Sequence, residues 1–312
     1  MVGAFPDILA ACKSGRTVRL VIENLGKRYG HERWGLRDVS VELGAGVVGL
    51  LGPNGAGKST LMRILATVTK PTTGRVLWDD ADITRRPEAL RAQLGYLPQD
   101  FGVYPHLNAL EFLGYMAAVK GLDRASARAR IGALLELLNL TDAAKRPLGT
   151  YSGGMRQRVG VAVALLSDPR VLIMDEPSVG LDPEERVGLR NLLSELSAER
   201  LVLLSTHVVS DVEAIASELV LIAGGRLLLK ASPEELLRRT AGMVWEWTVP
   251  AAELAGLRQR YVVGSAIRGA DGGVRVRVVA AQRPFVTAAA VSASLEDAYL
   301  HLAGGQRQAG GA

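Results

Sequence analysis

The segment GPNGAGKST, residues 52–60, constrains the fold of this chain more than any other stretch. It matches the pattern G-x-x-x-x-G-K-[ST], which is informative where a strand precedes it and a helix follows it. Both are expected here, because the apolar run GVVGLLG ends at the first glycine and the helical pattern LMRILATV begins after Thr60. Further apolar runs alternate with helical stretches on both sides of this loop. This alternation predicts an α/β fold with a mostly parallel sheet.

The same loop has the chemistry of a phosphate site. Its glycines allow the backbone to fold around an anion so that successive N–H groups point inward. The helix that begins near Lys58 adds roughly half a positive charge at its N-terminus. Lys58 itself supplies a full charge for the β- and γ-phosphates, and the hydroxyl of Ser59 is placed to hold Mg²⁺. We therefore predict a nucleotide site formed by Gly52, Pro53, Asn54, Gly55, Ala56, Gly57, Lys58, Ser59 and Thr60.

An acidic pair ends another predicted strand, VLIMDEP, at residues 171–177. Ligands of open α/β sheets bind at the carboxyl ends of the strands. Asp175 is therefore placed to orient the ligands of Mg²⁺, and Glu176 to polarise an attacking water as a general base. Many NTPases share the phosphate loop and this strand, so the two patterns predict ATP or GTP chemistry and little beyond it.

The composition of the chain excludes several other classes of protein. Its net charge of +5 is not gathered into one basic stripe, so no nucleic-acid partner is expected. The single cysteine, Cys12, excludes an internal disulfide framework and suits a reducing cytoplasm. No window approaches the roughly 18 uninterrupted apolar residues of a membrane span, so no span is expected either.

Changes in hydrophobic periodicity along the chain predict the domain organisation. Residues 1–16 read as a flexible N-terminal arm and residues 17–240 as the main domain. Helical patterns dominate from about 100 to 165, which predicts a helical insertion into the sheet. Further along, GGVRVRVVA alternates valine with arginine as a half-exposed strand does. Residues 241–302 are therefore expected to form a small C-terminal α/β appendage, and residues 303–312 a flexible tail.

Four short segments remain: YLPQD (96–100), YSGGMRQR (151–158), VGLDP (179–183) and STHVV (205–209). The Ser-Gly-Gly turn of the second one stands directly before a predicted helix. A helix N-terminus capped by serine and followed by bare glycine amides is an anion site. The phosphate loop already accounts for the chain's own nucleotide, so this second anion site has no ligand within the chain.

Read together, these segments resemble the ATP-binding subunits of ABC transporters, over residues 18–235 and in the family order. The resemblance implies a P-loop NTPase fold with a RecA-like core sheet and an inserted helical subdomain. It implies that Gln99 is the Q-loop glutamine, His207 the switch histidine and Tyr29 the aromatic residue that stacks on adenine. The signature motif is Ser152, Gly153 and Gly154, preceded by Tyr151 where leucine is commoner, and Asp182 lies in the D-loop.

The resemblance also implies ATP hydrolysis with Mg²⁺. The catalytic set is then Lys58, Gln99, Glu176 and His207, and the metal ligands are Ser59, Gln99 and Asp175. The signature motif closes on the γ-phosphate held by a second subunit, so that a homodimer or heterodimer buries two ATP molecules head to tail. An integral-membrane permease subunit docks near Phe101–Leu107. This places the chain peripherally at the cytoplasmic face of the bacterial inner membrane.

Two further segments bear on what is transported. SLEDAYLHLAG (294–304) and VYPHLNALEFLGYMAAVKGL (103–122) look like the ATPases of bacterial drug and antibiotic exporters. We therefore expect export of a hydrophobic small molecule. A nutrient-importer subunit would share every catalytic motif and is disfavoured only by these two segments. A soluble ABC-type ATPase acting on ribosomes or DNA is a third reading. It is disfavoured because the chain has one phosphate loop and residues 61–170 leave no room for long coiled coils.

Overall fold

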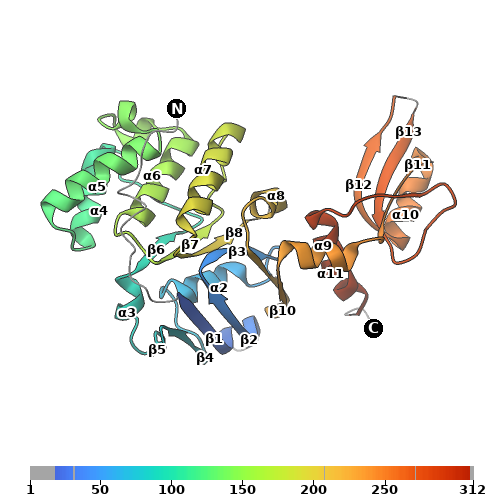
Figure 1. Cartoon of the computed structure of the whole chain (residues 1–312), viewed down its shortest axis with the longest axis horizontal. Helices are drawn as coiled ribbons and strands as arrows, with labels where there is room; N and C mark the ends of the chain where they lie inside the picture. Colours follow the sequence, from blue (N-terminus) through green and yellow to red (C-terminus); the bar gives the residue numbers. More distant parts are fainter. Residues whose placement is uncertain (1–17, 31, 207, 271, 310–312) are drawn as a thin grey trace. The chain divides into compact units, whose positions relative to one another are not determined.

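The computed structural model describes residues 18–30, 32–206, 208–270 and 272–309 (Figure 1). The predicted N-terminal arm, the end of the predicted tail and His207 lie outside these residues. The chain divides into two compact units, Met1–Lys230 and Ala231–Ala312. Among the described helices, none combines the length and apolar character needed to cross a bilayer.

A six-stranded sheet forms the centre of the first unit, in the order β10-β9-β3-β8-β7-β6. The strands β6, β7, β8, β3 and β9 pair in parallel. Every residue of β7 and β8 is buried, as expected for a parallel sheet covered on both faces. The predicted α/β class is therefore confirmed. In chain order these strands are β3 (Gly46–Leu51), β6 (Leu94–Leu97), β7 (Val171–Asp175), β8 (Leu201–Ser205), β9 (Glu218–Ala223) and β10 (Arg226–Ala231).

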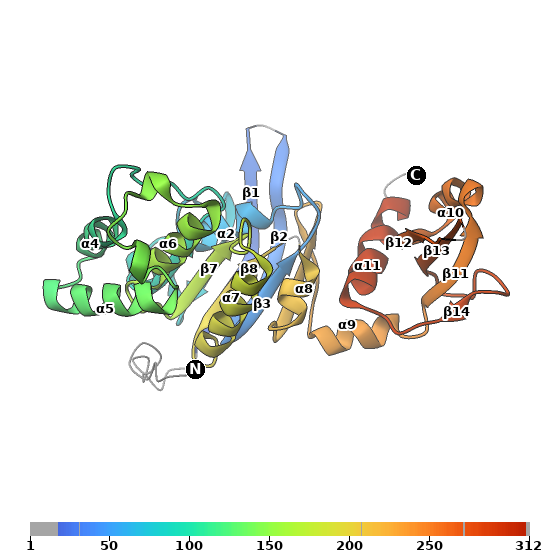
Figure 2. The same ribbon diagram turned by 90° about the horizontal axis from the view of Figure 1, so that it is seen from above.

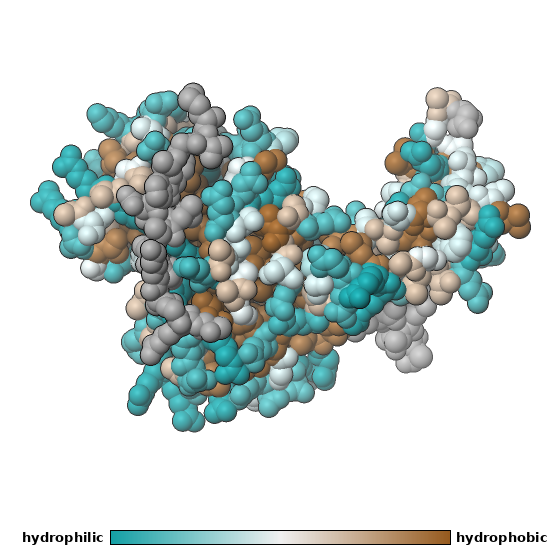
Figure 3. All heavy atoms as spheres, in the orientation of Figure 1, coloured by the Kyte–Doolittle hydropathy of each residue, from teal (hydrophilic) through white to brown (hydrophobic). Residues whose placement is uncertain are grey.

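A second, antiparallel sheet has the order β2-β1-β4-β5. Its strands are β1 (Arg19–Tyr29), β2 (Arg33–Gly44), β4 (Thr73–Trp78) and β5 (Ala81–Asp82). Helix α2 (Lys58–Leu65) lies between the two sheets, because its side chains Leu61 and Met62 share one core with Leu20 of β1 and Leu50 of β3. The start of α2 is thereby fixed at the carboxyl edge of the parallel sheet. In Figure 3 hydrophilic residues cover the outer edges of this unit, and hydrophobic ones show mainly between them.

Three helices occupy most of the segment predicted as a helical insertion: α4 (Ala109–Val119), α5 (Arg124–Leu137) and α6 (Gly153–Leu165). They lie together at one end of the first unit (Figure 2). Local sequence defines where they begin. Asn108 and Glu111 form a capping box at α4, and Asp123 accepts from two backbone N–H groups at α5. The other described α-helices of this unit are α7 (Pro183–Leu196) and two short ones, α3 (Glu88–Arg91) and α8 (Val209–Glu213).

The second unit contains an antiparallel sheet in the order β12-β13-β11-β14. In β13 the side chains of Val274, Val276 and Val278 are buried, as the alternation with arginine predicts. The unit begins about ten residues before the predicted boundary at 241, because α9 packs against α11. Its elements are α9 (Pro233–Thr240), β11 (Val244–Pro250), α10 (Leu254–Arg260), β12 (Val262–Arg268), β13 (Gly273–Val279), β14 (Ala289–Ala290) and α11 (Leu295–Ala309).

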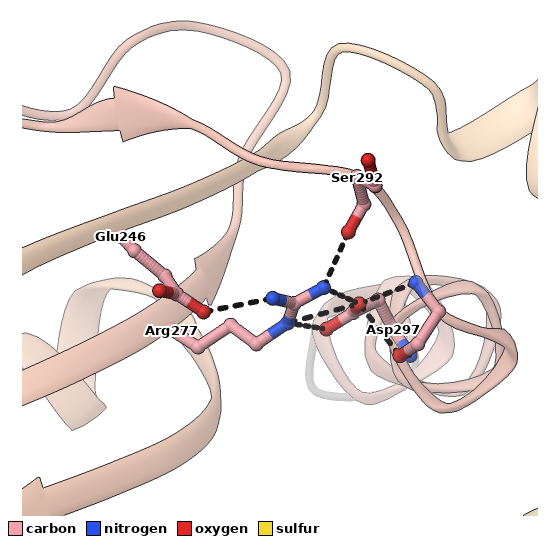
Figure 4. A network of polar contacts seen from close by, with 5 residues as sticks. Glu246, Arg277, Ser292 and Asp297 are labelled. Carbon is pink, nitrogen blue, oxygen red and sulfur yellow. Dashed lines mark hydrogen bonds and ion pairs between the residues drawn. The ribbon is translucent and has the colours of Figure 1, made fainter.

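A polar network attaches the first turn of α11 to the sheet of this unit (Figure 4). The helix extends to Ala309, whereas a flexible tail was predicted from residue 303. Arg277 donates through Nε and Nη2 to the Asp297 carboxylate and through Nη1 to Glu246 at 2.8 Å. Asp297 also accepts from the backbone N–H and the hydroxyl of Ser294, which caps the first turn. Burial by itself raises the pKa of Asp297, but these hydrogen bonds outweigh it and hold that pKa below its ordinary value.

Candidate functional site

The phosphate loop joins β3 to α2 and has the backbone that its sequence predicts. Gly55 and Gly57 have φ angles of 78° and 108°, in the left-handed region that favours glycine. A Cβ atom on Gly57 would lie 2.4 Å from the carbonyl oxygen of Gly35, so the position excludes every larger residue. The loop therefore follows a path that only glycine allows at this position.

Lys58 lies folded against the loop. Its Nζ donates to the carbonyl oxygens of Gly52, at 2.6 Å, and Pro53, at 3.2 Å. Burial lowers the pKa of Lys58, whereas the carboxylates of Glu176 and Asp175 act in the opposite direction. The structure therefore brings together the loop lysine and both predicted acids, although more than 110 residues separate them in the sequence.

The two acids differ in their surroundings. Asp175 is the last residue of β7 and is 4% exposed, so its carboxylate is held at the carboxyl edge of the sheet. Glu176 follows with a φ angle of 55°, a left-handed conformation that is uncommon for a residue other than glycine. The backbone N–H of Glu176 donates to the carbonyl oxygen of Ser205, at 2.9 Å. Such strained backbone is typical of functional sites and is held here by the neighbouring strand β8.

The predicted adenine residue and the Q-loop residue lie on surfaces next to this edge. The Tyr29 hydroxyl is 3.4 Å from Oγ1 of Thr60, in the first turn of α2, and the ring is 41% exposed. The ring is therefore accessible beside the phosphate loop. Gln99 follows β6 and lines a surface hollow together with Gly153 and Gln157 of α6. Gln157 in turn donates to the carbonyl oxygen of Glu176, at 3.4 Å.

The signature motif and the D-loop form a second group. Ser152 caps α6, its Oγ accepting from the N–H of Met155 at 3.1 Å. Asp182 caps α7 in the same way, accepting from Glu185. Gly154 brings the two helix starts together, because a Cβ there would lie 2.8 Å from Oε2 of Glu185. Ser152 and Gly153 are exposed, so the start of α6 is open to solvent.

Sequence reasoning missed two buried polar residues at this edge of the sheet. Asp211 of α8 is 4% exposed, accepts from the hydroxyl of Ser178 at 2.6 Å and pairs with Arg190 of α7 at 3.4 Å. This contact ties the turn after Glu176 to the turn that follows β8. Ser205, the last residue of β8, is 1% exposed, and its hydroxyl has no hydrogen-bond partner among the described residues. Neither residue carries a sequence signal, because an acid in a short helix is ordinarily solvated and a serine at the end of a strand is common.

The arrangement can hold a polyphosphate and activate water beside it. The loop amides, the N-terminus of α2 and Lys58 attract anionic oxygens. The carboxylate of Asp175 and the hydroxyl of Ser59 are oxygen donors of the kind that Mg²⁺ prefers. Glu176 follows Asp175 and lies near Lys58, at the end of the strand where a general base is needed.

Comparison with known proteins shows which family of nucleotide-binding proteins this chain resembles. The family model described as "ABC transporter" matches residues 36–179. The chain is 38% identical to the uncharacterized ABC transporter ATP-binding protein YxlF of Bacillus subtilis, over 74% of this chain and 76% of that protein. It is 35% identical to the doxorubicin resistance ATP-binding protein DrrA of Mycobacterium tuberculosis, over 70% and 67%. The solved dimeric structure of MJ0796, a bacterial ABC transporter cassette, superimposes with a TM-score of 0.63 at 25% identity, over 68% of this chain and 98% of that one.

Proposed function

Since this chain belongs to the ABC transporter family as one of its ATP-binding ATPases, we propose that it powers export of a hydrophobic small molecule through a separate integral-membrane permease. The observation that carries this proposal is the similarity to a doxorubicin resistance ATP-binding protein, which covers 67% of that protein. Doxorubicin resistance is a property of that relative. For this chain we take from it only the substrate class, a hydrophobic drug or lipid-like compound.

In the proposed reaction the phosphate loop, residues 52–60, holds the polyphosphate, and Tyr29 stacks on the adenine. Ser59, Asp175 and Gln99 hold Mg²⁺, which when bound neutralises charge on the β- and γ-phosphate oxygens. Lys58 leaves the carbonyl oxygens of Gly52 and Pro53 for the phosphates. Glu176 takes a proton from the attacking water, and His207 contacts the γ-phosphate. Support comes from the convergence of Lys58, Asp175 and Glu176 at one sheet edge.

We further propose that two copies of the ATPase subunit, or this chain and a relative, bind two ATP molecules between them. Ser152, Gly153 and Gly154 then contact the γ-phosphate held by the opposite subunit, and Asp182 lies at the same interface. Support comes from the exposure of the signature turn, because Ser152 and Gly153 at the start of α6 are open to contact from another subunit. A dimer is also the state described for the structurally similar cassette MJ0796.

The permease is proposed to dock near Phe101–Leu107, at the cytoplasmic face of the bacterial inner membrane. In this region Tyr104 packs edge-on against Phe112 and Tyr115, and the rings line a surface hollow. Tyr104 is 48% exposed and Tyr115 is 50% exposed. Exposed aromatic side chains of this kind are enriched at protein interfaces, which supports a docking surface here.

The test is to capture partners from native membranes with the Glu176→Gln protein in MgATP. Loss of the general base is expected to lower turnover by roughly 10²- to 10⁴-fold while ATP binding remains, so the closed complex accumulates. We expect a polytopic membrane protein to co-purify. The Lys58→Ala protein, which is expected to bind ATP more weakly, serves as the control at a limiting ATP concentration. Recovery of ribosomes or nucleic acid without a membrane protein would overturn the proposal.

Direction of transport needs a second measurement on the captured pair. Cells that produce both proteins are expected to accumulate less of a fluorescent hydrophobic drug than cells that produce the pair with Glu176→Gln. Increased, ATPase-dependent accumulation of a nutrient with no effect on drug content would instead identify an importer.

A further inference from the structure

Ser205 presents an unexplained feature of the sheet edge. Its side chain is almost completely buried, with 1% exposure, and Oγ has no hydrogen-bond partner among the described residues. A buried hydroxyl without a partner is destabilising, because it has lost its hydrogen bonds to water and gained none in return. Most buried polar groups are paired, so an unpaired one points to a role in function or to a missing ligand.

The register of the sheet shows what this hydroxyl faces. Ser205 of β8 is paired with Asp175 of β7 on one side and with Leu50 of β3 on the other. Paired residues of adjacent parallel strands lie about 4.8 Å apart and point to the same face. Leu50 belongs to the core that also contains Leu61 and Met62 of α2. Ser205 and Asp175 therefore lie side by side on the face covered by the phosphate-loop helix.

Two buried hydroxyls in the turns that follow β7 and β8 have partners. The Thr206 hydroxyl accepts from the N–H of Val208 at 3.0 Å, and Ser178 donates to Asp211 at 2.6 Å. Ser217, an exposed residue just before β9, also donates to the carbonyl oxygen of Val47, at 3.1 Å. The residue next to Ser205 in the chain thus has a structural partner, whereas Ser205, next to the proposed metal ligand, has none within the part of the chain that the structure describes. A purely structural serine at this position would have no reason to differ.

We infer that Ser205 is a positioning residue of the magnesium site: its hydroxyl donates to the Asp175 carboxylate when that carboxylate faces the ion bound with the nucleotide. The hydrogen bond would fix which carboxylate oxygen remains for the ion and its water ligands. Residues that orient a metal ligand in this way commonly change metal affinity by about 10- to 100-fold. The inference rests on the nucleotide site proposed above.

The test compares metal dependence with stability. We expect Ser205→Ala to raise the Mg²⁺ concentration needed for half-maximal binding of a fluorescent ATP analogue by about 10-fold. Binding of the same analogue in EDTA is expected to remain unchanged. The melting temperature without nucleotide should stay the same or rise by roughly 2–4 °C, because an unpaired buried hydroxyl has been removed. Ser217→Ala, which removes a paired hydroxyl, should lower the melting temperature and leave the Mg²⁺ dependence unchanged.

A pair of variants with equal shape isolates the hydroxyl. Ser205→Thr keeps it and Ser205→Val does not, so only the second should lose Mg²⁺ affinity. Equal Mg²⁺ dependence in both variants, or a melting temperature of Ser205→Ala that falls as in Ser217→Ala, would overturn the inference. Absence of Mg²⁺-dependent ATP binding by the unaltered protein would overturn the proposed nucleotide site together with the inference. Normal binding without any membrane partner would contradict only the proposed transport function.

Discussion

Three charged residues, Lys58, Asp175 and Glu176, lie close together at the phosphate loop. Lys58 is partly withdrawn from water, which disfavours its charged form, while Asp175 and Glu176 favour that form. The lysine donates to two loop carbonyls, so its ammonium group is held against the loop and exchanges these carbonyls for phosphate oxygens when ATP binds. A cation prepared in this way loses little freedom when an anion arrives, and its removal affects binding directly.

Lys58→Ala is therefore expected to weaken ATP binding by roughly 10- to 100-fold, the range for loss of hydrogen bonds to a charged group. The measurement is an equilibrium titration with a fluorescent ATP analogue in Mg²⁺. Lys145→Ala, at an exposed position of the helical insertion, is the matched control and should bind as the unaltered protein does. Unchanged affinity in Lys58→Ala would contradict the assignment of the loop.

Among the helices and strands, α11 shows how one arginine attaches a helix to a sheet. Arg277 of β13 reaches Asp297 in the first turn of α11 and Glu246 of β11. Asp297 is 2% exposed, so its charge depends on this pairing. The segment SLEDAYLHL thus owes its order to a residue about 20 positions earlier, as well as to its own capping serine.

Asp297→Asn should accordingly destabilise the second unit by roughly 2 kcal/mol at neutral pH, because Arg277 loses its buried partner. The folded-state pKa of Asp297 lies below its ordinary value of 3.8, so the ion pair stabilises the fold above that pH. Its contribution disappears as the pH falls through the folded-state pKa. Urea unfolding followed by tryptophan fluorescence should therefore show a gap between the two proteins that narrows in acid. Glu296→Gln, in the same turn, is the control, and an equal effect there would contradict the role of Asp297.

The proposed dimer requires a glycine in the signature turn that the fold of a single subunit does not require. A Cβ atom on Gly153 would have no neighbour within 4 Å among the described residues, whereas one on Gly154 would collide with Glu185. Within the chain, then, nothing requires glycine at position 153. A requirement for glycine there would have to come from a second subunit that approaches the backbone closely.

Gly153→Ala is expected to fold with an unchanged melting temperature and to bind ATP as the unaltered protein does. Combined with Glu176→Gln, it should prevent the ATP-dependent dimer that Glu176→Gln alone forms, and by itself it should lower ATPase turnover by about 10-fold or more. Analytical ultracentrifugation with and without MgATP measures the first effect. A stable ATP dimer in the double variant would argue against this face as the subunit interface.

The sequence by itself determined the family, the α/β class and the position of the phosphate loop. Each of these depends on residues that are contiguous in the chain, such as the strand, glycine loop and helix around Lys58, where local backbone preferences decide the conformation. The roles of Gln99, His207, Tyr29 and the signature motif stay predictions. His207 lies outside the described residues, and the others depend on ligands or on a second subunit.

Only the tertiary structure decided which polar residues are buried and what each one faces. Ser205 lies beside Asp175 because β8 pairs with β7 in one register, and Asp211 meets Ser178 because α8 packs beside the turn after Glu176. The same holds for α11, which was predicted to end in a flexible tail and instead continues to Ala309, with its first turn held by Arg277. Burial and pairing arise from packing between segments that are distant in the chain, and hydrophobic periodicity records only which face of a segment is buried.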